Sequence, residues 1–384
     1  MAIRVNPKLI KELEKYGAAD VSNCYHCGNC SAACPFSKDP YVIPRRSMRH
    51  LQMGLEDKLR DTLEPWLCYY CGECSTQCPR GAEPGETMMS LRRWLTSRYD
   101  FTGISRLFYR SWKAELAALI LVSLATAVGF LMMGLKLGGG NFNVYAGAGA
   151  LFPPDKVHYI DLALAGFLAS LLAINSVRMW WFTTGRNPAL HPPLWSYVRN
   201  LFLLPMHFLS QVRYSKCEKK SPWVFHLAIF LGWVTMEILI VFFLHRMHEA
   251  ETIWTAHAFG YVATIGLLGG VTYAMIGRLR KRESHYKHTH ATDLIFLILI
   301  AGTAATGILQ HISYRLFGMD AMANVAYLVH MMFVVPLLGI QLPFSKLSHL
   351  AYRPLAMYLV AVHRDALARR QVVEVEPGTA KVAA

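Results

Sequence analysis

Charged residues are scarce in this chain of 384 residues, and cysteine is almost absent after residue 78. Asp, Glu, Lys and Arg make up 17% of the sequence, whereas apolar residues make up 54%. That apolar share is high for a soluble protein, and the apolar residues are concentrated after residue 113. A soluble head followed by a membrane-embedded body is therefore expected. Beyond residue 78 the single cysteine is Cys217, so thiol chemistry is expected near the N-terminus.

The chain also lacks a recognisable nucleotide-binding loop. Its Gly-rich stretch, residues 137–154, contains no Lys-Ser/Thr pair and follows no strand, so we interpret it as a connector. The net charge of +14 raises the question of nucleic acid. The basic residues lie between apolar spans, which the positive-inside rule explains. We expect no nucleic-acid partner and no flavin site in the chain itself.

Two cysteine runs, residues 24–35 and residues 68–79, share the spacing C-x2-C-x2-C-x3-C-P. In this spacing the first three thiolates wrap one face of a cubane [4Fe–4S] cluster, and the fourth cysteine ligates the other cluster. The runs therefore predict two clusters with crossed ligation. The first cluster is expected on Cys24, Cys27, Cys30 and Cys78, and the second on Cys68, Cys71, Cys74 and Cys34.

Zinc and disulfide bonds are the alternative roles for these cysteines. Structural zinc takes four ligands in all from separated C-x2-C pairs, unlike two crowded quartets that each end in Cys-Pro. Disulfides need an oxidising compartment. The segment from Met1 to Tyr16 is polar and charged and does not resemble a signal peptide. We therefore expect clusters in a reducing compartment.

The segment between the runs, Pro44 to Leu63, has apolar residues at helical spacings and few β-branched residues. A second helix is expected from about Pro84. The runs, this helical spacer and the turn from Cys78 to Gly85 resemble the α-helical ferredoxin domain, which occurs in the C-type iron–sulfur protein of heterodisulfide reductase and in succinate dehydrogenase iron–sulfur subunits. The resemblance implies an all-α, two-cluster domain over residues 1–105.

Six apolar stretches are long enough to cross a hydrocarbon core of about 30 Å, which takes about 20 residues. Basic residues gather in the connections after the second and fourth stretches, which places those connections and both termini in the cytoplasm. We expect a multi-pass protein of the inner membrane, with a transmembrane domain over residues 106–355 and a cytoplasmic tail over residues 356–384, disordered after about Ala366. The spans are expected at residues 114–136, 157–181, 222–244, 254–277, 291–312 and 323–344.

Histidine is rare in apolar spans and is a candidate for function there. Neutral imidazole is a ligand of haem iron, and a polar packing role is the alternative. The helical rise of 1.5 Å per residue sorts these histidines by depth. His226 and His349 fall near the inner face and are expected to share one haem b, whereas His330 falls in the outer half. The candidates for the partner of His330 are His257 at a similar depth, and His245 and His311 nearer the outer surface.

The stretch from Leu328 to His349 resembles the last helix of the membrane cytochrome b of respiratory nitrate reductase, whose family includes the E-type membrane protein of heterodisulfide reductase. In that family this helix supplies one ligand to each of two stacked haems b, and an earlier helix supplies the other two. His226 matches the inner ligand of the earlier helix. The outer one would fall near Met236, which departs from the pattern.

A helical ferredoxin head fused to such a body resembles the C-type membrane protein (QmoC) of the quinone-interacting membrane-bound oxidoreductase (Qmo) family of sulfate reducers, over roughly residues 20–355. The resemblance implies an electron-transfer subunit. Menaquinol is oxidised in the membrane, haems b carry electrons inward, and the clusters pass them to two flavin and iron–sulfur partner subunits, with adenylylsulfate reductase beyond. The alternatives are a heterodisulfide-reductase-like protein with another lipid-soluble donor or a thiol/disulfide partner, and a redox sensor.

Glu237 adds a candidate for proton transfer. It lies about two-thirds of the way across the third span, where a charge is costly. It follows His226 by eleven residues, and eleven helical steps return to nearly the same face. Two roles stay open at this stage. One is a hydrogen-bonded core carboxyl, and the other is a proton acceptor or donor at a quinone site, which makes Glu237 the catalytic candidate.

Overall fold

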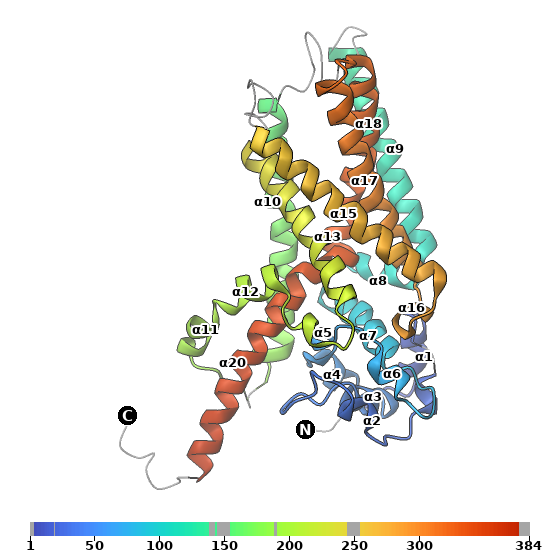
Figure 1. Ribbon diagram of the computed structural model, residues 1–384. Coiled ribbons are helices and arrows are strands. Elements are labelled where there is room, and N and C mark those ends of the chain that lie inside the picture. The colour runs from blue at the N-terminus through green and yellow to red at the C-terminus, as the bar shows by residue number, and fades with distance from the viewer. Residues whose placement is uncertain are drawn as a thin grey trace. The chain divides into compact units, whose positions relative to one another are not determined.

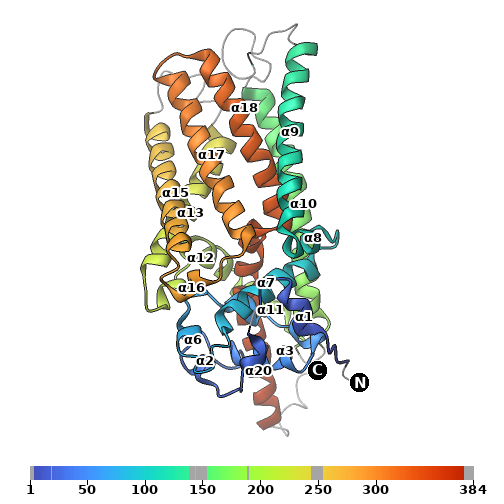
Figure 2. The ribbon, with the colours of Figure 1, turned by 90° about the vertical axis from the view of Figure 1, so that its right-hand side faces the viewer.

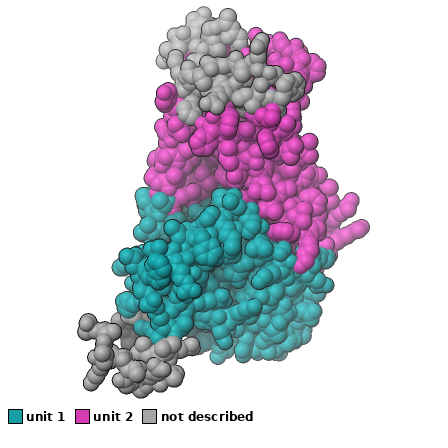
Figure 3. Space-filling model, turned by 60° about the vertical axis from the view of Figure 1, so that its left-hand side comes forward, with its two compact units in different colours: residues 1–106, 173–219, 348–384 teal, residues 107–172, 220–347 magenta. Residues whose placement is uncertain are grey.

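The computed structural model describes residues 4–18, 20–137, 143, 154–187, 190–243 and 254–375. These residues form helices and no strands, and the sole β pairing among them is an isolated bridge between Lys38 and Tyr41 (Figures 1 and 2). The expected all-α class is confirmed. The chain divides into two compact units, coloured separately in Figure 3. Unit 1 comprises residues 1–106, 173–219 and 348–384, and unit 2 comprises residues 107–172 and 220–347.

The N-terminal part of unit 1 is a set of short helices around one longer one. The longer helix is α7, Pro84–Tyr99, which begins with proline in its first turn as expected and is buried along most of its length. The spacer between the cysteine runs forms two helices rather than one, because Gly54 intervenes with a positive φ of 67°. The short helices are α1 (Leu9–Glu14), η1 (Val21–Asn23), α2 (Asn29–Ala32), α3 (Arg45–Gln52), α4 (Glu56–Arg60), α5 (Glu64–Leu67) and α6 (Glu73–Thr76).

The rest of unit 1 comes from two later segments. The last helix, α20 (His349–Val375), packs on α5, on α11 (Leu194–Asn200) and on α12 (Leu203–Ser210). It extends past Ala366, where disorder was expected to begin, as far as Val375, and residues 376–384 lie outside the described residues. The part of the helix before Ala366 carries a buried stripe with spacings of three and four residues. The stripe comprises Tyr352, Ala356, Leu359 and His363.

Unit 2 contains most of the apolar helices. The six candidate spans agree with the six expected ones to within a few residues, and they are consistent with a multi-pass membrane protein. They run over Trp112–Leu135, Tyr159–Gly185, Ser221–Phe243, Thr255–Arg280, Ala291–Arg315 and Asp320–Phe344. The elements of the spans and their connections are α8 (Ile104–Arg110), α9 (Trp112–Leu137), α10 (Pro154–Trp180) with π-helix η2 (Trp181–Gly185), α13 (Ser221–Ile238) with π-helix η4 (Leu239–Phe243), α15 (Trp254–Arg280), α16 (Ser284–Lys287), α17 (Ala291–Arg315), and α18 (Asp320–Pro336) with π-helix η5 (Leu337–Gln341), α19 (Leu342–Phe344) and η6 (Lys346–Ser348). Of these, the end of α10 from Ala173 onward and the whole of η2 belong to unit 1.

Within unit 2, helix α13 packs on α15, α15 on α17, α17 on α18, and α18 on α9 (Figures 1 and 2). Glycines allow the backbones to approach closely, as in other membrane bundles. A Cβ added at Gly232 of α13 would lie 2.6 Å from the carbonyl oxygen of Ala263, and one added at Gly270 of α15 would lie 2.7 Å from that of Phe225. Such contacts fix the order of the helices that carry the histidines.

Candidate redox centres

The two cysteine runs fold into loops of the same shape. In each run the residue before the second cysteine and the glycine after it have positive φ angles. These are 59° and 93° for His26 and Gly28, and 55° and 87° for Tyr70 and Gly72. Glycine adopts this region without strain. Each loop then enters a one-turn helix, α2 or α6, which carries the third cysteine, and these two helices pack on each other.

Two pockets result, each lined by four cysteines. Site I is lined by Cys24, Cys27, Cys30 and Cys78. Site II is lined by Cys34, Cys68, Cys71 and Cys74. Each pocket thus takes three cysteines from one run and the last cysteine from the other. This is the grouping that crossed ligation requires, while ligation itself stays a prediction.

Three of the thiols at these sites have raised pKa values, so without a metal centre they would stay protonated. Burial, followed by repulsion from a neighbouring cysteine, raises the pKa of Cys30 to about 11 and that of Cys34 to about 12. Burial likewise raises the pKa of Cys74 well above its usual value. Bound cations reverse this balance, because a coordinating thiol loses its proton. The donor sets therefore fit iron–sulfur clusters.

Buried arginines add positive charge beside site II. Arg92 donates from Nε to the carbonyl oxygen of Pro65 at 2.7 Å, while its Nη2 is buried without a hydrogen-bond partner among the described residues. Burial, followed by repulsion from Arg353, lowers the pKa of Arg92 to about 9, and the Cys68 thiolate opposes that shift. Buried cations are costly without an anion. An anionic cluster ligated by four thiolates would supply one.

Aromatic rings cover the same side of site II. The Tyr69 ring lies 5.0 Å from the Phe36 ring and 5.0 Å from the Tyr214 ring, measured between centroids. The Arg353 guanidinium lies 4.0 Å above the Tyr69 ring and donates to the carbonyl oxygen of Cys68 at 3.3 Å. These rings and the arginine pack against the loop that carries Cys68.

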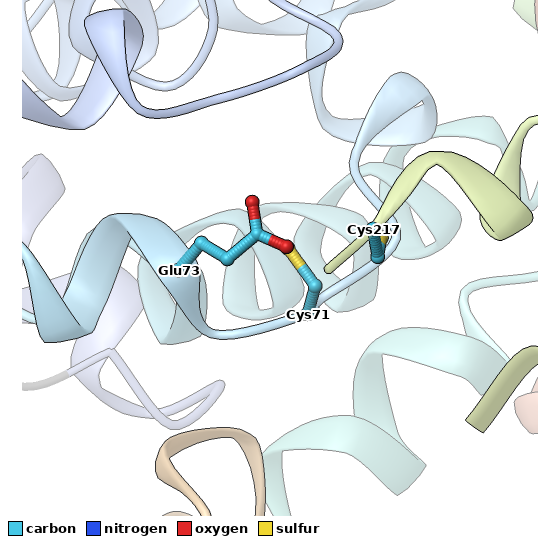
Figure 4. Close-up of side chains that lie close together, drawn as sticks. All are labelled: Cys71, Glu73 and Cys217. Atoms are coloured by element: carbon cyan, nitrogen blue, oxygen red, sulfur yellow. The ribbon is translucent and has the colours of Figure 1, made fainter. Parts of the chain in front are cut away.

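Cys217, the cysteine outside the two runs, also reaches site II. Its Sγ, the Sγ of Cys71 and a carboxylate oxygen of Glu73 all lie within 4.8 Å of one another (Figure 4). The two sulfurs are close enough for a hydrogen bond. A cysteine sulfur that ligates a metal carries no proton, so in a loaded site Cys217 would be the donor. Sequence reasoning missed this contact because 146 residues separate the pair and no spacing rule joins them.

The inner histidines belong to different units. His226 lies in the second turn of α13 in unit 2 and is half-buried. His349 is the first residue of α20 in unit 1 and is also half-buried. Their joint ligation of one haem b stays a prediction.

His330 has the surroundings of an oriented ligand. Its Nδ1 lies 3.1 Å from the Thr306 hydroxyl, and a Cβ added at Gly307 would lie 3.1 Å from its Cε1. A hydrogen bond at one ring nitrogen fixes which nitrogen is offered to a metal. With Nδ1 engaged, Nε2 is the nitrogen that remains for haem iron. The residues around His330 therefore fit a haem ligand.

Two of the histidines suggested as the second ligand beside His330, His257 and His311, lie close to each other. The rings of His257 and His311 are 4.9 Å apart, and the Tyr261 ring lies 5.5 Å from that of His311. The Nδ1 of His257 is buried without a partner among the described residues. His245 falls outside the described residues. The structure thus brings His257 to His311, and ligation of the outer haem by His257 stays a prediction.

Two carboxyl groups of unit 2 are candidates for proton transfer. Glu237 of α13 is half-buried, and its role stays a prediction. Sequence reasoning missed Glu115, which is fully buried in the first turn of α9. Its Oε1 accepts hydrogen bonds from Gln341 Nε2 at 2.8 Å and Ser345 Oγ at 2.7 Å, while its Oε2 has no partner among the described residues. More than 220 residues separate these groups, so only the fold joins them.

Comparisons with known proteins match both parts of the chain. A family model described as a 4Fe-4S dicluster domain matches residues 20–82. The E-type membrane protein of dihydromethanophenazine:CoB–CoM heterodisulfide reductase from Methanosarcina thermophila is 30% identical over 203 residues, which cover 48% of this chain and 74% of that relative. The chain belongs to this family of E-type heterodisulfide reductase proteins. No solved structure matches it.

The N-terminal part resembles a different component of heterodisulfide reductase. A protein of Archaeoglobus profundus that is described as like the C-type component is 34% identical over 93 residues, which cover 24% of this chain. The chain spans about half the length of that relative, 48%. This member of the E-type family is therefore a heterodisulfide-reductase-like membrane electron-transfer subunit fused to an iron–sulfur domain. The expected fusion is confirmed at that level.

Proposed function

We propose that this protein carries electrons from menaquinol in the membrane to flavin and iron–sulfur subunits in the cytoplasm, as QmoC does in the Qmo family. The clusters at sites I and II would form the soluble end of the path, and haem b would form the membrane end. Both termini would lie on the cytoplasmic side of the inner membrane, where thiolates stay reduced. The basic connections between spans support this orientation.

One observation within unit 1 carries the proposal. Helix α20 begins at His349, the expected ligand of the inner haem, and reaches Arg353 one turn later. That arginine donates to the Cys68 carbonyl at 3.3 Å and covers the Tyr69 ring at 4.0 Å. One helical turn rises about 5.4 Å. The same helix would therefore hold the haem at its first residue and contact the site II loop at its fifth.

The residues that would hold the haems are His226 and His349 for the inner one, and His330 with His257 for the outer one. Haem iron supplies one-electron transfer when it is bound, and each [4Fe–4S] cluster does the same. Thr306 would orient His330 through Nδ1, and Arg353 would orient the Cys68 segment. The assignment of His257 as the second ligand of the outer haem rests on its expected depth in the membrane. In the structure the His257 ring lies beside that of His311.

Menaquinol oxidation also requires proton acceptors. Each quinol becomes a quinone by giving up two electrons and two protons, and the haems and clusters take only the electrons. We propose Glu237 as the acceptor of a proton from the quinol hydroxyl. Ionisable groups within spans mark such routes. Glu115 is the second candidate, because its Oε2 is buried without a partner among the described residues and is open to a hydroxyl donor.

The exit of the path would be site I, where Cys27 is exposed and the Tyr25 ring is 70% exposed. Partner subunits with flavin and iron–sulfur centres would dock there, with adenylylsulfate reductase as the final acceptor. These partners follow from the Qmo resemblance. The chain would then be one part of a quinone-linked oxidoreductase rather than a complete enzyme.

A second candidate function is suggested by the relatives themselves. Two E-type relatives, from Methanosarcina thermophila and Methanosarcina barkeri, are named for dihydromethanophenazine and for the CoB–CoM heterodisulfide. The same fold would then accept electrons from a phenazine or another lipid-soluble donor and pass them to a thiol/disulfide partner. The identity of the carrier distinguishes the two functions.

Reduction of the isolated complex tests the proposal. A menaquinol analogue and a dihydrophenazine analogue are compared as donors, with haem followed optically and the clusters followed by electron paramagnetic resonance. Faster haem reduction by the menaquinol analogue supports the Qmo-like function, and faster reduction by the phenazine supports the second candidate. If neither donor reduces any centre while dithionite does, electron transfer from a lipid-soluble carrier is refuted.

Arg353→Gln tests the observation that carries the proposal, with Arg369→Gln as its control on the exposed end of the same helix. Hydrogen bonds to charged groups contribute about 1.5–3 kcal/mol, and about 1.4 kcal/mol changes a rate tenfold. We therefore expect electron transfer from haem to cluster to slow roughly tenfold in Arg353→Gln and to keep its wild-type rate in the control. Wild-type kinetics in both variants would remove α20 from the path.

A further inference from the structure

Cys217 is held against the loop of site II from both sides. Three residues before it, the Tyr214 ring stacks on the Tyr69 ring at 5.0 Å. One residue after it, the Glu218 amide donates to Glu73 Oε1 at 2.8 Å. Cys217 itself is 1% exposed. Its neighbours therefore hold Cys217 in contact with Cys71. Figure 4 shows the side chains of Cys71, Glu73 and Cys217 close together.

The thiol of Cys217 is surplus to the ligands that a cubane needs. Site II already has four cysteines around its pocket, and a [4Fe–4S] cluster takes four. A separate metal ion on Cys71, Glu73 and Cys217 would compete with the cluster for Cys71. Glu73 Oε1 is also occupied by the Glu218 amide. The role open to Cys217 is that of a hydrogen-bond donor to a ligand sulfur.

We propose that the Cys217 thiol donates a hydrogen bond to the Cys71 sulfur and thereby raises the reduction potential of the site II cluster. The inference rests on the proposed cluster at site II and adds a positioning residue that ligates no iron. Hydrogen bonds to cluster sulfurs offset the negative charge that reduction adds, so they favour the reduced state. Cysteines beyond the four ligands do not line the site I pocket in the described chain. The bond therefore makes the two clusters unequal.

Redox titration of the whole complex, followed by electron paramagnetic resonance, tests this inference. Cys217→Ala should shift the site II cluster to a lower potential, leave the site I cluster unchanged, and retain the full iron content. Cys217→Ser, which keeps a hydroxyl donor, should recover part of the shift. Ser215→Ala is the matched control, because Ser215 lies on the same segment and its hydroxyl donates to the Val212 carbonyl at 2.8 Å.

The possible outcomes are separable. An unchanged potential in Cys217→Ala, or a shift no larger than that of Ser215→Ala, overturns the inference. Loss of one cluster's iron, about half of the non-haem iron of this chain, also overturns it, since Cys217 would then be a ligand. The serine variant reports iron content if the alanine variant misfolds. Absence of a second cluster signal in the wild-type complex would instead refute the two-cluster proposal. That result concerns the function and not Cys217.

Discussion

The two cluster pockets share a loop but not an environment. At site I, Cys27 is exposed and the Arg80 guanidinium lies 4.3 Å above the open Tyr25 ring. At site II, Cys74 is buried and the arginines and rings of later segments cover the loop. Burial, nearby charge and hydrogen bonds to sulfur set cluster potentials. In the proposed function, site II would receive electrons from the membrane and site I would release them to a soluble partner.

The strongest test of this comparison replaces the fourth cysteine of each run by serine. Cys34→Ser should remove the cluster at site II, and Cys78→Ser should remove the one at site I, because each run lends its last cysteine to the other pocket. Each variant should lose about half of the non-haem iron of this chain, since its two cubanes hold equal amounts. Iron content and magnetic resonance spectra measure this. If Cys34→Ser spares site II and empties site I, ligation is not crossed.

The next largest effect concerns the haem that would feed site II. His226→Ala and His349→Ala should each abolish the same low-spin haem signal, because both imidazoles are expected to bind one iron. Optical and magnetic resonance spectra of the purified complex measure this. His207→Ala, in a helix outside the spans, serves as the control and should keep both signals. If the two variants lose different haem signals, His226 and His349 do not bind the same haem, and the proposed path from that haem to site II is wrong.

Much of this architecture was readable in the sequence, for a clear physical reason. Cysteine spacing within one loop and apolar length within one helix are local properties, so the runs and the six spans appear directly. The contacts of Cys217 and Glu115 join segments that lie far apart in the chain, and no local pattern encodes them. The helical stripe of α20 was concealed by its polar outer face. Its buried residues pack against α5 and α12, which are distant in the sequence.

The third prediction concerns proton transfer by Glu237 in the membrane-spanning part of the chain. Glu237→Gln keeps size and hydrogen bonding but removes proton exchange. General-base catalysis contributes about 10²–10⁴-fold, so haem reduction by the menaquinol analogue should slow by roughly that factor. Haem content and dithionite reduction should stay normal. Glu115→Gln, measured in parallel by stopped-flow absorbance, should retain faster kinetics. If only Glu115→Gln is slow, the carrier binds at the Glu115 end of the bundle.

The smallest expected effect concerns the attachment of α20 beside site II. The His363 Nδ1 lies 2.7 Å from the Tyr41 hydroxyl and its Nε2 lies 2.8 Å from the Thr184 hydroxyl. Burial lowers the pKa of His363 from 6.5 to about 4. Because the unfolded chain binds the proton first, stability is lost as the pH falls from 6.5 toward 4, by up to about 3 kcal/mol.

Thermal loss of cluster absorbance between pH 7 and pH 4.5 measures this effect. The wild-type complex should lose thermal stability on acidification, and His363→Gln should lose less. His191→Gln is the control, because the His191 side chain is exposed. An equal pH dependence in His363→Gln and in the wild type would show that His363 does not hold α20 in place.

The order of the centres is the central claim, and reoxidation tests it most directly. The dithionite-reduced complex is mixed with a menaquinone analogue, frozen at intervals, and examined by magnetic resonance for each cluster. In the wild type, the haem and both clusters should reoxidise together. In Cys74→Ser, which should lack the site II cluster, the haem should reoxidise while the site I cluster stays reduced. Reoxidation of site I at the wild-type rate in that variant would contradict the account.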